Sequence, residues 1–561
     1  MPEITARKVD AAALAALIAA GVDVRMARLY AARGVAGVDA LRTDASALVA
    51  PQALAHVEEA AKLLADAIEA KKKLLIVADY DADGATACAV GLRALRSMGA
   101  SVDYLVPNRF EYGYGLTPEI VRLAAQRGPD ILITVDNGIA SVEGVDEANR
   151  LGMQVLVTDH HLPGDTLPAA VCIVNPNQAG CGFPSKHLAG VGVIFYIMLA
   201  LRAELRQRGV FASGVEPNLA DFLDLVALGT VADVVRMDAN NRILVYQGLA
   251  RIRAGRGHAG INALLQAGGR DARQARTYDL GFVVGPRLNA AGRLDDMSLG
   301  IECLTTDDAA VAQRIAQQLD QLNRERRAIE AGMQEDALTH LDEIEMTGSY
   351  SLCLFQPDWH QGVIGILASR IKDKFHRPVL AFARAGNGEI KGSGRSIPAL
   401  HLRDAIDLVT KRHPGMVLRF GGHAAAAGLT LAEDALAPFA AAFESVSREW
   451  LSPADLQQRI ETDGELADAD INFDFVCAIE GQVWGQGFPV PSFSGRLRVL
   501  SQRIVGERHL KLRVSQQSVT FDALLFGHTD TLPGAIDAVY HLQLNEFRGE
   551  STLQMVIEHW A

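Results

Sequence analysis

The sequence predicts a protein of several α/β domains that ends in a β-rich domain. Its 561 residues are too many for one hydrophobic core and correspond to roughly three or four domains. From about residue 50 to about residue 300, short apolar runs alternate with helical stretches, which is the pattern of a parallel sheet covered by helices on both faces. Near the C-terminus, apolar and polar residues alternate as they do in half-buried strands.

The chain divides into five expected parts. They are an N-terminal helical segment over residues 1–49, an α/β domain over 50–305, a connecting helix over 306–347, a second α/β domain over 348–451 and a β-rich domain over 454–561. The first α/β domain is expected from apolar runs at 74–77, 131–135 and 155–157, with amphipathic stretches at 85–98 and 118–127 between them.

The connecting helix is predicted from residues 306–345, which contain no proline and one glycine. Their apolar residues recur mostly at intervals of three, four or seven, and a helix of this length would span roughly 60 Å at 1.5 Å per residue. We expect its charged face, with Arg324, Arg326 and Arg327, to be solvated. In the β-rich domain, His541–Phe547 and Thr552–Ile557 predict a hairpin.

The composition restricts the class of function. Apolar residues make up 49% and charged residues 22%, which excludes a largely disordered chain. With 54 Lys and Arg against 67 Asp and Glu, the net charge of −13 gives no support for nucleic-acid binding, which would need a local basic groove. The six scattered cysteines form no CxxC pair, which argues against a disulfide framework and a thiolate zinc site.

Neither a signal peptide nor a membrane span is predicted. The N-terminus lacks the basic-then-apolar layout of a signal peptide, and the longest apolar run, 191–201, is far shorter than the ~20 residues that a bilayer crossing needs. We therefore expect a soluble cytoplasmic protein.

Acidic residues and histidines follow the predicted strands. The segments are DYDADG at 79–84, Asp136-Asn137-Gly138, Thr158-Asp159-His160-His161 and, as a fourth candidate, 227–235 with Asp233. Each alone is also typical of a helix N-cap or a turn. Together they would meet, because ligand sites in open parallel sheets form beyond the carboxyl ends of the strands.

This set of side chains predicts a divalent-metal site. Asp81, Asp83, Asp136, His160 and Asp233 offer mostly oxygen ligands with one imidazole, which suits manganese or magnesium better than zinc. Without a cation, such crowded carboxylates would repel one another. If Asp136 bridges, two ions could lie about 3.5–4 Å apart, an arrangement that favours hydrolysis at phosphorus.

Other motifs keep two interpretations each. GSGRS at 392–396 is either a phosphate-binding nest or a plain glycine turn. Tyr112 and Tyr114 either stack on bases or only shape their loop. Trp484, Phe488 and Phe493 are candidates for stacking on bases or for the hydrophobic core.

The motifs resemble those of the DHH phosphoesterase superfamily, named for the triplet Asp159-His160-His161. Within it, the chain from about residue 50 to its end resembles the RecJ family. The similar motifs are NRFEYGYG at 108–115, GPRLNAAGR at 285–293, HQGVIG at 360–365, GSGRS at 392–396 and GGH at 421–423. The resemblance implies a DHH domain over 50–305, a DHH-associated domain over 348–451 and an oligonucleotide-binding (OB-like) barrel over 454–561.

The resemblance also implies an activity and its cofactors. RecJ-like enzymes are exonucleases specific for single-stranded DNA, which they degrade 5′ to 3′ to mononucleotides with Mn²⁺ or Mg²⁺, in DNA repair and recombination. The partners implied are single-stranded DNA, the single-strand-binding protein and a RecQ-type helicase, with no membrane and with a monomeric protein.

Roles for individual residues follow by analogy. Asp81 and Asp136, joined by Asp79, would hold one ion, while Asp83, Asp136, His160 and Asp233 would hold the other. His161 would point at the scissile phosphate and Asp159 would orient a histidine. Val77 stands near the place where other DHH branches carry a histidine, so the first ion's ligand set is the least defined. The candidates for binding DNA phosphates are Arg109, Arg287, Arg293, Ser393, Arg395 and His423.

Three alternatives compete with this interpretation. A DHH phosphodiesterase for short RNA or cyclic dinucleotides would share the metal site, but it would be shorter and would lack the C-terminal barrel; a family pyrophosphatase would lack the GGH segment. An inactive DHH-derived scaffold of the replication fork would have lost metal ligands, whereas every proposed ligand is present here.

Overall fold

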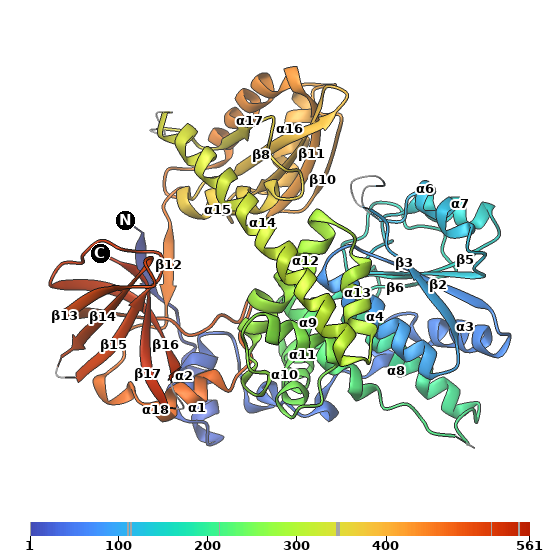
Figure 1. The fold of residues 1–561 in the computed structure, drawn as a ribbon, viewed down its shortest axis with the longest axis horizontal. Coiled ribbons are helices and arrows are strands. Elements are labelled where there is room, and N and C mark those ends of the chain that lie inside the picture. The colour runs from blue at the N-terminus through green and yellow to red at the C-terminus, as the bar shows by residue number, and fades with distance from the viewer. Residues whose placement is uncertain are drawn as a thin grey trace. The chain divides into compact units, whose positions relative to one another are not determined.

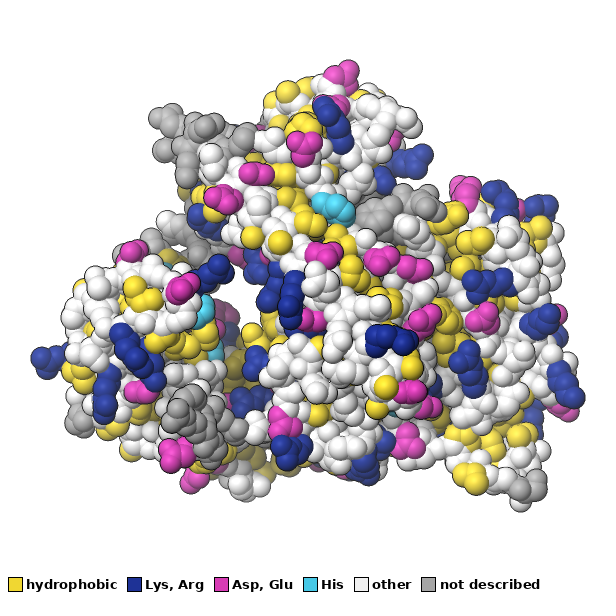
Figure 2. All heavy atoms as spheres, in the orientation of Figure 1, with side chains coloured by type: hydrophobic (Ala, Val, Ile, Leu, Met, Phe, Trp, Pro, Cys, Tyr) yellow, Lys and Arg dark blue, Asp and Glu magenta, His cyan; other side chains and the backbone are white. Residues whose placement is uncertain are grey.

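The chain folds into two compact units in a computed structural model, which describes residues 2–108, 112, 115–212, 214–343, 348–517, 519–547 and 550–561 (Figure 1). The larger unit contains Ala6–Gln321 and Thr462–Ala561, and the smaller contains Met1–Thr5 and Leu322–Glu461. No helix among the described residues has the length and apolarity needed to cross a membrane. Acidic and basic side chains both occur on the visible face of each unit (Figure 2).

A five-stranded parallel sheet forms the centre of the larger unit. Its order is β3 (Ser101–Leu105), β2 (Lys73–Ala78), β4 (Ile131–Val135), β5 (Gln154–Thr158) and β6 (Cys172–Val174). The strands predicted at 74–77, 131–135 and 155–157 are confirmed. Each is an apolar run because both faces of a parallel sheet are buried.

Helices cover both faces of this sheet (Figure 1). One face packs against α6 (Pro118–Ala125) and α7 (Val142–Arg150), and the other against α4 (Ala82–Ser97), with α3 (Val57–Glu69) and α8 (Gly190–Gln207) alongside. Strand β2 shows how its sequence serves both faces. Leu75 and Val77 enter the core under α6 and α7, whereas Ile76 lies directly against Gly91 of α4.

The prediction that the segment 227–235 is a strand followed by an acidic residue is wrong. The segment belongs to helix α9 (Leu223–Ala232), and Asp233 caps the C-terminus of that helix. A short, largely apolar run is compatible with a buried helix as well as a buried strand, so its composition did not distinguish the two. The following helices are α10 (Ala239–Arg253), α11 (Ala259–Ala267), the π-helix η6 (Asp279–Val284), α12 (Gly285–Leu294) and α13 (Ser298–Thr305).

A closed five-stranded barrel ends the chain. Its strands are β13 (Phe493–Val505), β14 (His509–Gln516), β15 (Val519–Leu525), β17 (Glu550–Trp560) and β16 (Ala535–Phe547), in that order around the barrel. Neighbours are antiparallel except β15 and β17. The predicted hairpin is confirmed as β16–β17, and alternate residues of β14, such as Leu510, Leu512 and Val514, fill the interior.

The N-terminal helices α1 (Ala11–Ala19) and α2 (Val24–Ala31) belong to the same unit as the barrel. The ring of Tyr30 on α2 stacks 6.1 Å from that of Trp484, which lies 5.1 Å from Phe488. Trp484, Phe488 and Phe493 are all buried, so the core interpretation is confirmed for them and the base-stacking one is wrong. Asp463 forms a buried, two-bonded ion pair with Arg33.

A mixed five-stranded sheet forms the smaller unit. Its order is β10 (Arg419–Gly422), β11 (Ala426–Ala432), β9 (Glu389–Arg395), β8 (Val379–Gly386) and β7 (Leu352–Phe355), with only β7 and β8 parallel. Helices α15 (Ile364–Phe375), α16 (Leu402–Arg412) and α17 (Leu436–Trp450) pack on it, and β12 (Arg459–Thr462) pairs with β1 (Glu3–Ala6).

The predicted long helix is confirmed as α14 (Ala309–Glu343). Its charged face is not fully solvated, however. Arg326 is buried, donates to Glu330 at 2.7 Å and contacts Asn323, while Glu330 also accepts from Arg370 at 2.9 Å. Arg326 is therefore a structural residue that ties α14 to α15.

Candidate metal centre

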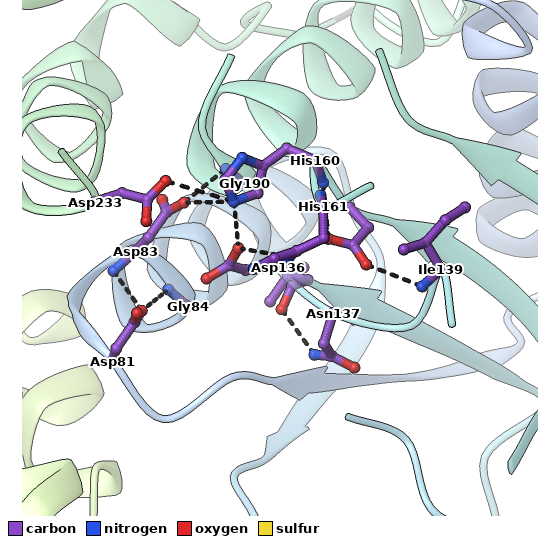
Figure 3. Close-up of polar contacts among 12 residues, drawn as sticks. Asp81, Asp83, Gly84, Asp136, Asn137, Ile139, His160, His161, Gly190 and Asp233 are labelled. Carbon is purple, nitrogen blue, oxygen red and sulfur yellow. Dashed lines mark hydrogen bonds and ion pairs between the residues drawn. The ribbon is translucent and has the colours of Figure 1, made fainter. Parts of the chain in front are cut away.

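Carboxylates and imidazoles converge at the carboxyl ends of β2, β4 and β5, as the strand-end pattern predicts (Figure 3). The loop after β2 and the start of α4 supply Asp79, Asp81 and Asp83. The segment after β4 supplies Asp136, and the segment after β5 supplies His160 and His161. Asp233 reaches the same place from the end of α9 rather than from a strand.

Three overlapping groups of side chains have metal-ligating atoms within 4.8 Å of one another. The groups are Asp79, Asp81 and Asp136; Asp83, His160 and Asp233; and Asp136, His160 and His161. Asp136 belongs to two of the groups. The Nε2 atom of His160 lies 3.1 Å from Oδ1 of Asp136, 3.4 Å from Oδ2 of Asp233 and 4.0 Å from Oδ2 of Asp83.

The electrostatics of the cluster are those of a cation site. Burial, together with the charge of Asp81, raises the pKa of Asp83 to about 7. Burial and the charges of the neighbouring carboxylates raise the pKa values of Asp136 and Asp233 well above the usual range. A divalent cation would remove this penalty by stabilising the charged forms, and the oxygen-rich set with one imidazole fits manganese or magnesium.

Asp159 belongs to none of the three groups and contacts His161, a member of one of them. Its Oδ1 lies 2.8 Å from Nδ1 of His161 and accepts from the backbone N–H groups of His160 and His161, while Oδ2 accepts from Ile139 N. Burial alone would raise the pKa of Asp159, but the His161 contact and the backbone donors hold it below its usual value. Burial by itself would lower the pKa of His161. The neighbouring carboxylates, of which Asp159 has the largest effect, outweigh burial and raise this pKa to about 8.

Local backbone contacts fix the acidic side chains in place. Oδ1 of Asp81 caps α4 by accepting from Asp83 N at 2.9 Å and Gly84 N at 3.0 Å, so the N-cap interpretation also holds for Asp81. The two oxygens of Asp83 accept from Gly190 N at 2.6 Å and Val191 N at 2.9 Å at the start of α8. The N-terminal end of α8 thus holds the Asp83 carboxylate.

Several residues that support the centre were not predicted from the sequence. A Cβ atom on Gly190 would lie 2.6 Å from Cβ of Asp136, and one on Gly229 would lie 2.8 Å from Oδ1 of Asp83. In GPRLNAAGR, Asn289 accepts from Ala82 N at 2.8 Å, and Gly292 packs against the backbone of Tyr80. The motif GPRLNAAGR is the sequence signal for this role, although its arginines by themselves indicate phosphate binding.

The arginines of the larger unit differ in their surroundings. Arg287 donates to Asp320 from Nε at 3.0 Å and forms an ion pair with it through Nη2 at 2.7 Å, while Nη1 donates to Val283 O. It therefore ties α12 to α14 in this structure. Arg293 is half-buried near the end of α12. Arg109 and Tyr114 lie outside the described residues, and Tyr112 packs against the core under α6 and α7.

The motif GSGRS is neither a nest nor a turn. Its first four residues, 392–395, lie in strand β9, which pairs with β8 on one side and with β11 on the other, so their backbone is part of the sheet. A Cβ atom on Gly394 would lie 2.6 Å from Cδ2 of Leu380, and one on Gly392 would overlap the ring of Phe382. The glycines of the motif are thus required by packing across the sheet.

The side chains of Ser393 and Arg395 form a small polar site with Gly365 of HQGVIG. A Cβ atom on Gly365 would lie 2.8 Å from Oγ of Ser393 and 3.2 Å from Nη2 of Arg395. Arg395 donates to Ser393 Oγ and Gly394 O, and burial lowers its pKa. No carboxylate among the described residues forms an ion pair with it. His423, after β10, is exposed, and its backbone N–H donates to the carbonyl oxygen of Ala426 at 2.8 Å.

Three family models match the chain. They are the DHH family, N-terminal domain, over residues 73–230; the DHHA1 domain over 348–449; and the RecJ OB domain over 462–559.

Curated relatives match along most of their length. The chain is 52% identical to the single-stranded-DNA-specific exonuclease RecJ of Dickeya dadantii and 50% identical to that of Escherichia coli, in each case covering 95% of both chains. It is 32% identical to the RecJ of Bacillus subtilis, covering 64% of that protein.

Solved structures also match. The structure of RecJ from Thermus thermophilus in complex with Mn²⁺ has a TM-score of 0.81 and 28% identity, with 100% of this chain and 79% of that chain covered. The corresponding Mg²⁺ complex has a TM-score of 0.76 and 28% identity, and covers 100% of this chain and 78% of that chain.

Proposed function

Because the chain belongs to the RecJ family, we propose that it is an exonuclease specific for single-stranded DNA, with Mn²⁺ or Mg²⁺ as its cofactor. The observation that carries the proposal is the convergence of buried carboxylates and His160 around Asp136. The finer features of the proposal are hydrolysis in the 5′ to 3′ direction, release of mononucleotides and a role in DNA repair and recombination.

Two metal positions are part of the proposal, and they are supported by ligand groups that overlap at Asp136 and His160. Asp79, Asp81 and Asp136 would hold one ion, and Asp83, Asp136, His160 and Asp233 the other. When bound, such a pair polarises a phosphoryl oxygen, lowers the pKa of a water molecule and clamps the attacking and leaving oxygens. Asp136 would be the bridging ligand.

The protein's own groups orient and hydrogen-bond the substrate. Asp159 fixes the imidazole of His161 through Nδ1 and, with other carboxylates, keeps its pKa near 8. The imidazole is therefore oriented to donate a hydrogen bond to an oxygen of the scissile phosphate. The backbone N–H groups of Gly190 and Val191 keep Asp83 in place while the substrate binds.

Arginines and neighbouring polar side chains would bind the phosphates of the strand. Arg395 and Ser393 are the strongest candidates, since Arg395 forms no ion pair with a described carboxylate and is largely desolvated. Arg109, Arg293 and His423 are further candidates. Arg287 would have to exchange Asp320 for a phosphate oxygen, which makes it a weaker one.

The proposal extends to partners and location. We expect the single-strand-binding protein and a RecQ-type helicase as partners, a monomeric protein and a cytoplasmic location. These expectations rest on membership of the family. A pull-down with the single-strand-binding protein, with and without its acidic tail, tests the first of them, because equal retention would exclude that tail as the docking element.

The deciding experiment is a digest of 5′- and 3′-labelled single and double strands with Mn²⁺ or Mg²⁺, with a chelator and the Asp136→Asn variant as controls. We expect mononucleotides from the 5′ label first, from single strands only, and no product in either control. An intact single strand, or faster turnover of a cyclic dinucleotide or a very short RNA, would contradict the proposed substrate. Early release of the 3′ label would contradict the polarity alone.

A further inference from the structure

Two aromatic side chains are exposed beside each other on the segment that leads into α12. Tyr278 is 57% exposed and Phe282 is 67% exposed. Their rings are stacked, with centroids 5.0 Å apart and planes 23° from parallel. The guanidinium carbon of Arg270 lies 6.0 Å from the centroid of the Tyr278 ring. Exposed apolar surface of this kind marks a site of interaction more often than a single exposed side chain does.

The packing of this segment does not require the aromatic pair. Its inner face is formed by Leu280, Val283 and Val284, which are buried in the unit. Phe282 lies in the π-helix η6, and Tyr278 directly precedes it. Short π-helices interrupt regular α-helices at a cost and are frequent at functional sites.

The segment is continuous with a support of the metal centre. The π-helix η6 runs directly into α12, which packs beside α9 and α13 (Figure 1). Farther along α12, Asn289 accepts from Ala82 N in the acidic loop. Seven residues separate Phe282 from Asn289, which corresponds to about 10 Å along a helix, or about three nucleotides of a stacked strand.

We propose that Tyr278 and Phe282 form a platform on which unpaired bases of the substrate strand stack, about three to five nucleotides from the cleaved bond. The proposal rests on the proposed function. A base that stacks on the outer face of the Phe282 ring would continue the existing stack, while Arg270 lies over the Tyr278 ring. Every base has such a face, so the platform would tolerate any sequence, but paired bases inside a duplex could not reach it. In a protein of net charge −13, such contacts would supplement phosphate binding.

The test compares variants that keep or remove an aromatic ring. Phe282→Leu keeps apolar bulk without a π-face, Phe282→Trp keeps the ring, and Tyr278→Leu is a second, independent variant. Trp450→Leu is the matched control, because Trp450 is 38% exposed at the C-terminal end of α17, outside the barrel. Binding to a fluorescent, 5′-phosphorylated oligothymidylate is measured with a chelator present, so that no cleavage occurs, and thermal melting confirms that each variant is folded.

We expect Phe282→Leu and Tyr278→Leu each to weaken binding about 5- to 150-fold, the loss of one stacked base. Phe282→Trp and the control should bind like the original protein. Strands with one abasic site, placed at each position in turn, locate the contact. At the platform position the abasic site should weaken binding by the original protein, and Phe282→Leu should cause no further loss of binding to that strand.

Full binding by both leucine variants, or additive losses with the abasic strand at every position, would overturn the platform. This outcome is distinguishable from a failure of the proposed function. If the original protein neither binds nor digests single strands, the function is wrong. If it digests them and the leucine variants bind normally, only the platform is wrong.

Discussion

Gly190 at the start of α8 has room for hydrogen only, and an added methyl group should displace the bridging aspartate. A Cβ atom there would lie 2.6 Å from Cβ and 2.7 Å from Oδ1 of Asp136, whereas ordinary contact begins at 3.4 Å. In Gly190→Ala the Asp136 side chain must therefore move by about 0.8 Å, the difference between 3.4 Å and 2.6 Å.

The effect on turnover should be large and the effect on stability small. Asp136 belongs to two of the three ligand groups, and its Oδ1 lies 3.1 Å from Nε2 of His160. A misplacement of about 1 Å in such a site costs on the order of 10²-fold in rate. The extra methyl group should cost only about 1–3 kcal/mol of folding stability, as other overpacked cores do.

The assay measures turnover of a labelled single strand and the melting temperature, with Gly192→Ala as the matched control. Gly192 is on the same helix, but a Cβ atom there would meet Leu188, with Cγ at 2.7 Å, instead of a metal ligand. The control should lose stability while keeping turnover. Wild-type turnover in Gly190→Ala, or an equal loss in both variants, would refute the reasoning.

Three further predictions concern the ligands, the phosphate site and the N-terminal contact. Asp136→Asn should abolish cleavage in Mn²⁺ and Asp79→Asn should reduce it less, because only the bridging carboxylate would touch both ions; equal residual rates would contradict the bridge. Arg395→Ala should slow digestion of a 5′-phosphorylated strand more than digestion of a 5′-hydroxyl strand, and it should flatten the salt dependence of binding by about one contact. Equal losses on both strands would mean that Arg395 contacts an internal phosphate of the DNA or has only a structural role. Asp463→Ala should lower the free energy of unfolding by about 3–5 kcal/mol, since it leaves the Arg33 guanidinium, 1% exposed, without its carboxylate; urea unfolding that matches the original protein would contradict that value.

The strand-end acids were predictable because their signal is local. An apolar run followed by Asp or His is visible in the sequence, and the direction of parallel strands places such residues at one edge of the sheet. Asp233 lies in the cluster as the sequence predicts, but it comes from the end of a helix and not from the end of a strand. Its neighbours are apolar in any case, and only tertiary packing decides between a buried helix and a buried strand.

The glycines could not be interpreted from the sequence alone, because each is required by a distant atom. Gly190 faces Asp136, and Gly392 faces the ring of Phe382 on the adjacent strand. A motif such as GSGRS therefore looks like a flexible turn although it is a paired strand. Trp484 is a similar case, since its partner Tyr30 lies near the other end of the chain.

The contact between Arg33 and Asp463 sets an order of events during synthesis. At about 5–20 residues per second, the 430 residues between them take on the order of 20 to 90 s to be translated. Over that interval the apolar side of α2, including Tyr30, has been made but Trp484 has not. The first helices to leave the ribosome are thus among the last to be buried, and a chain that stalls before residue 462 keeps an aggregation-prone surface exposed.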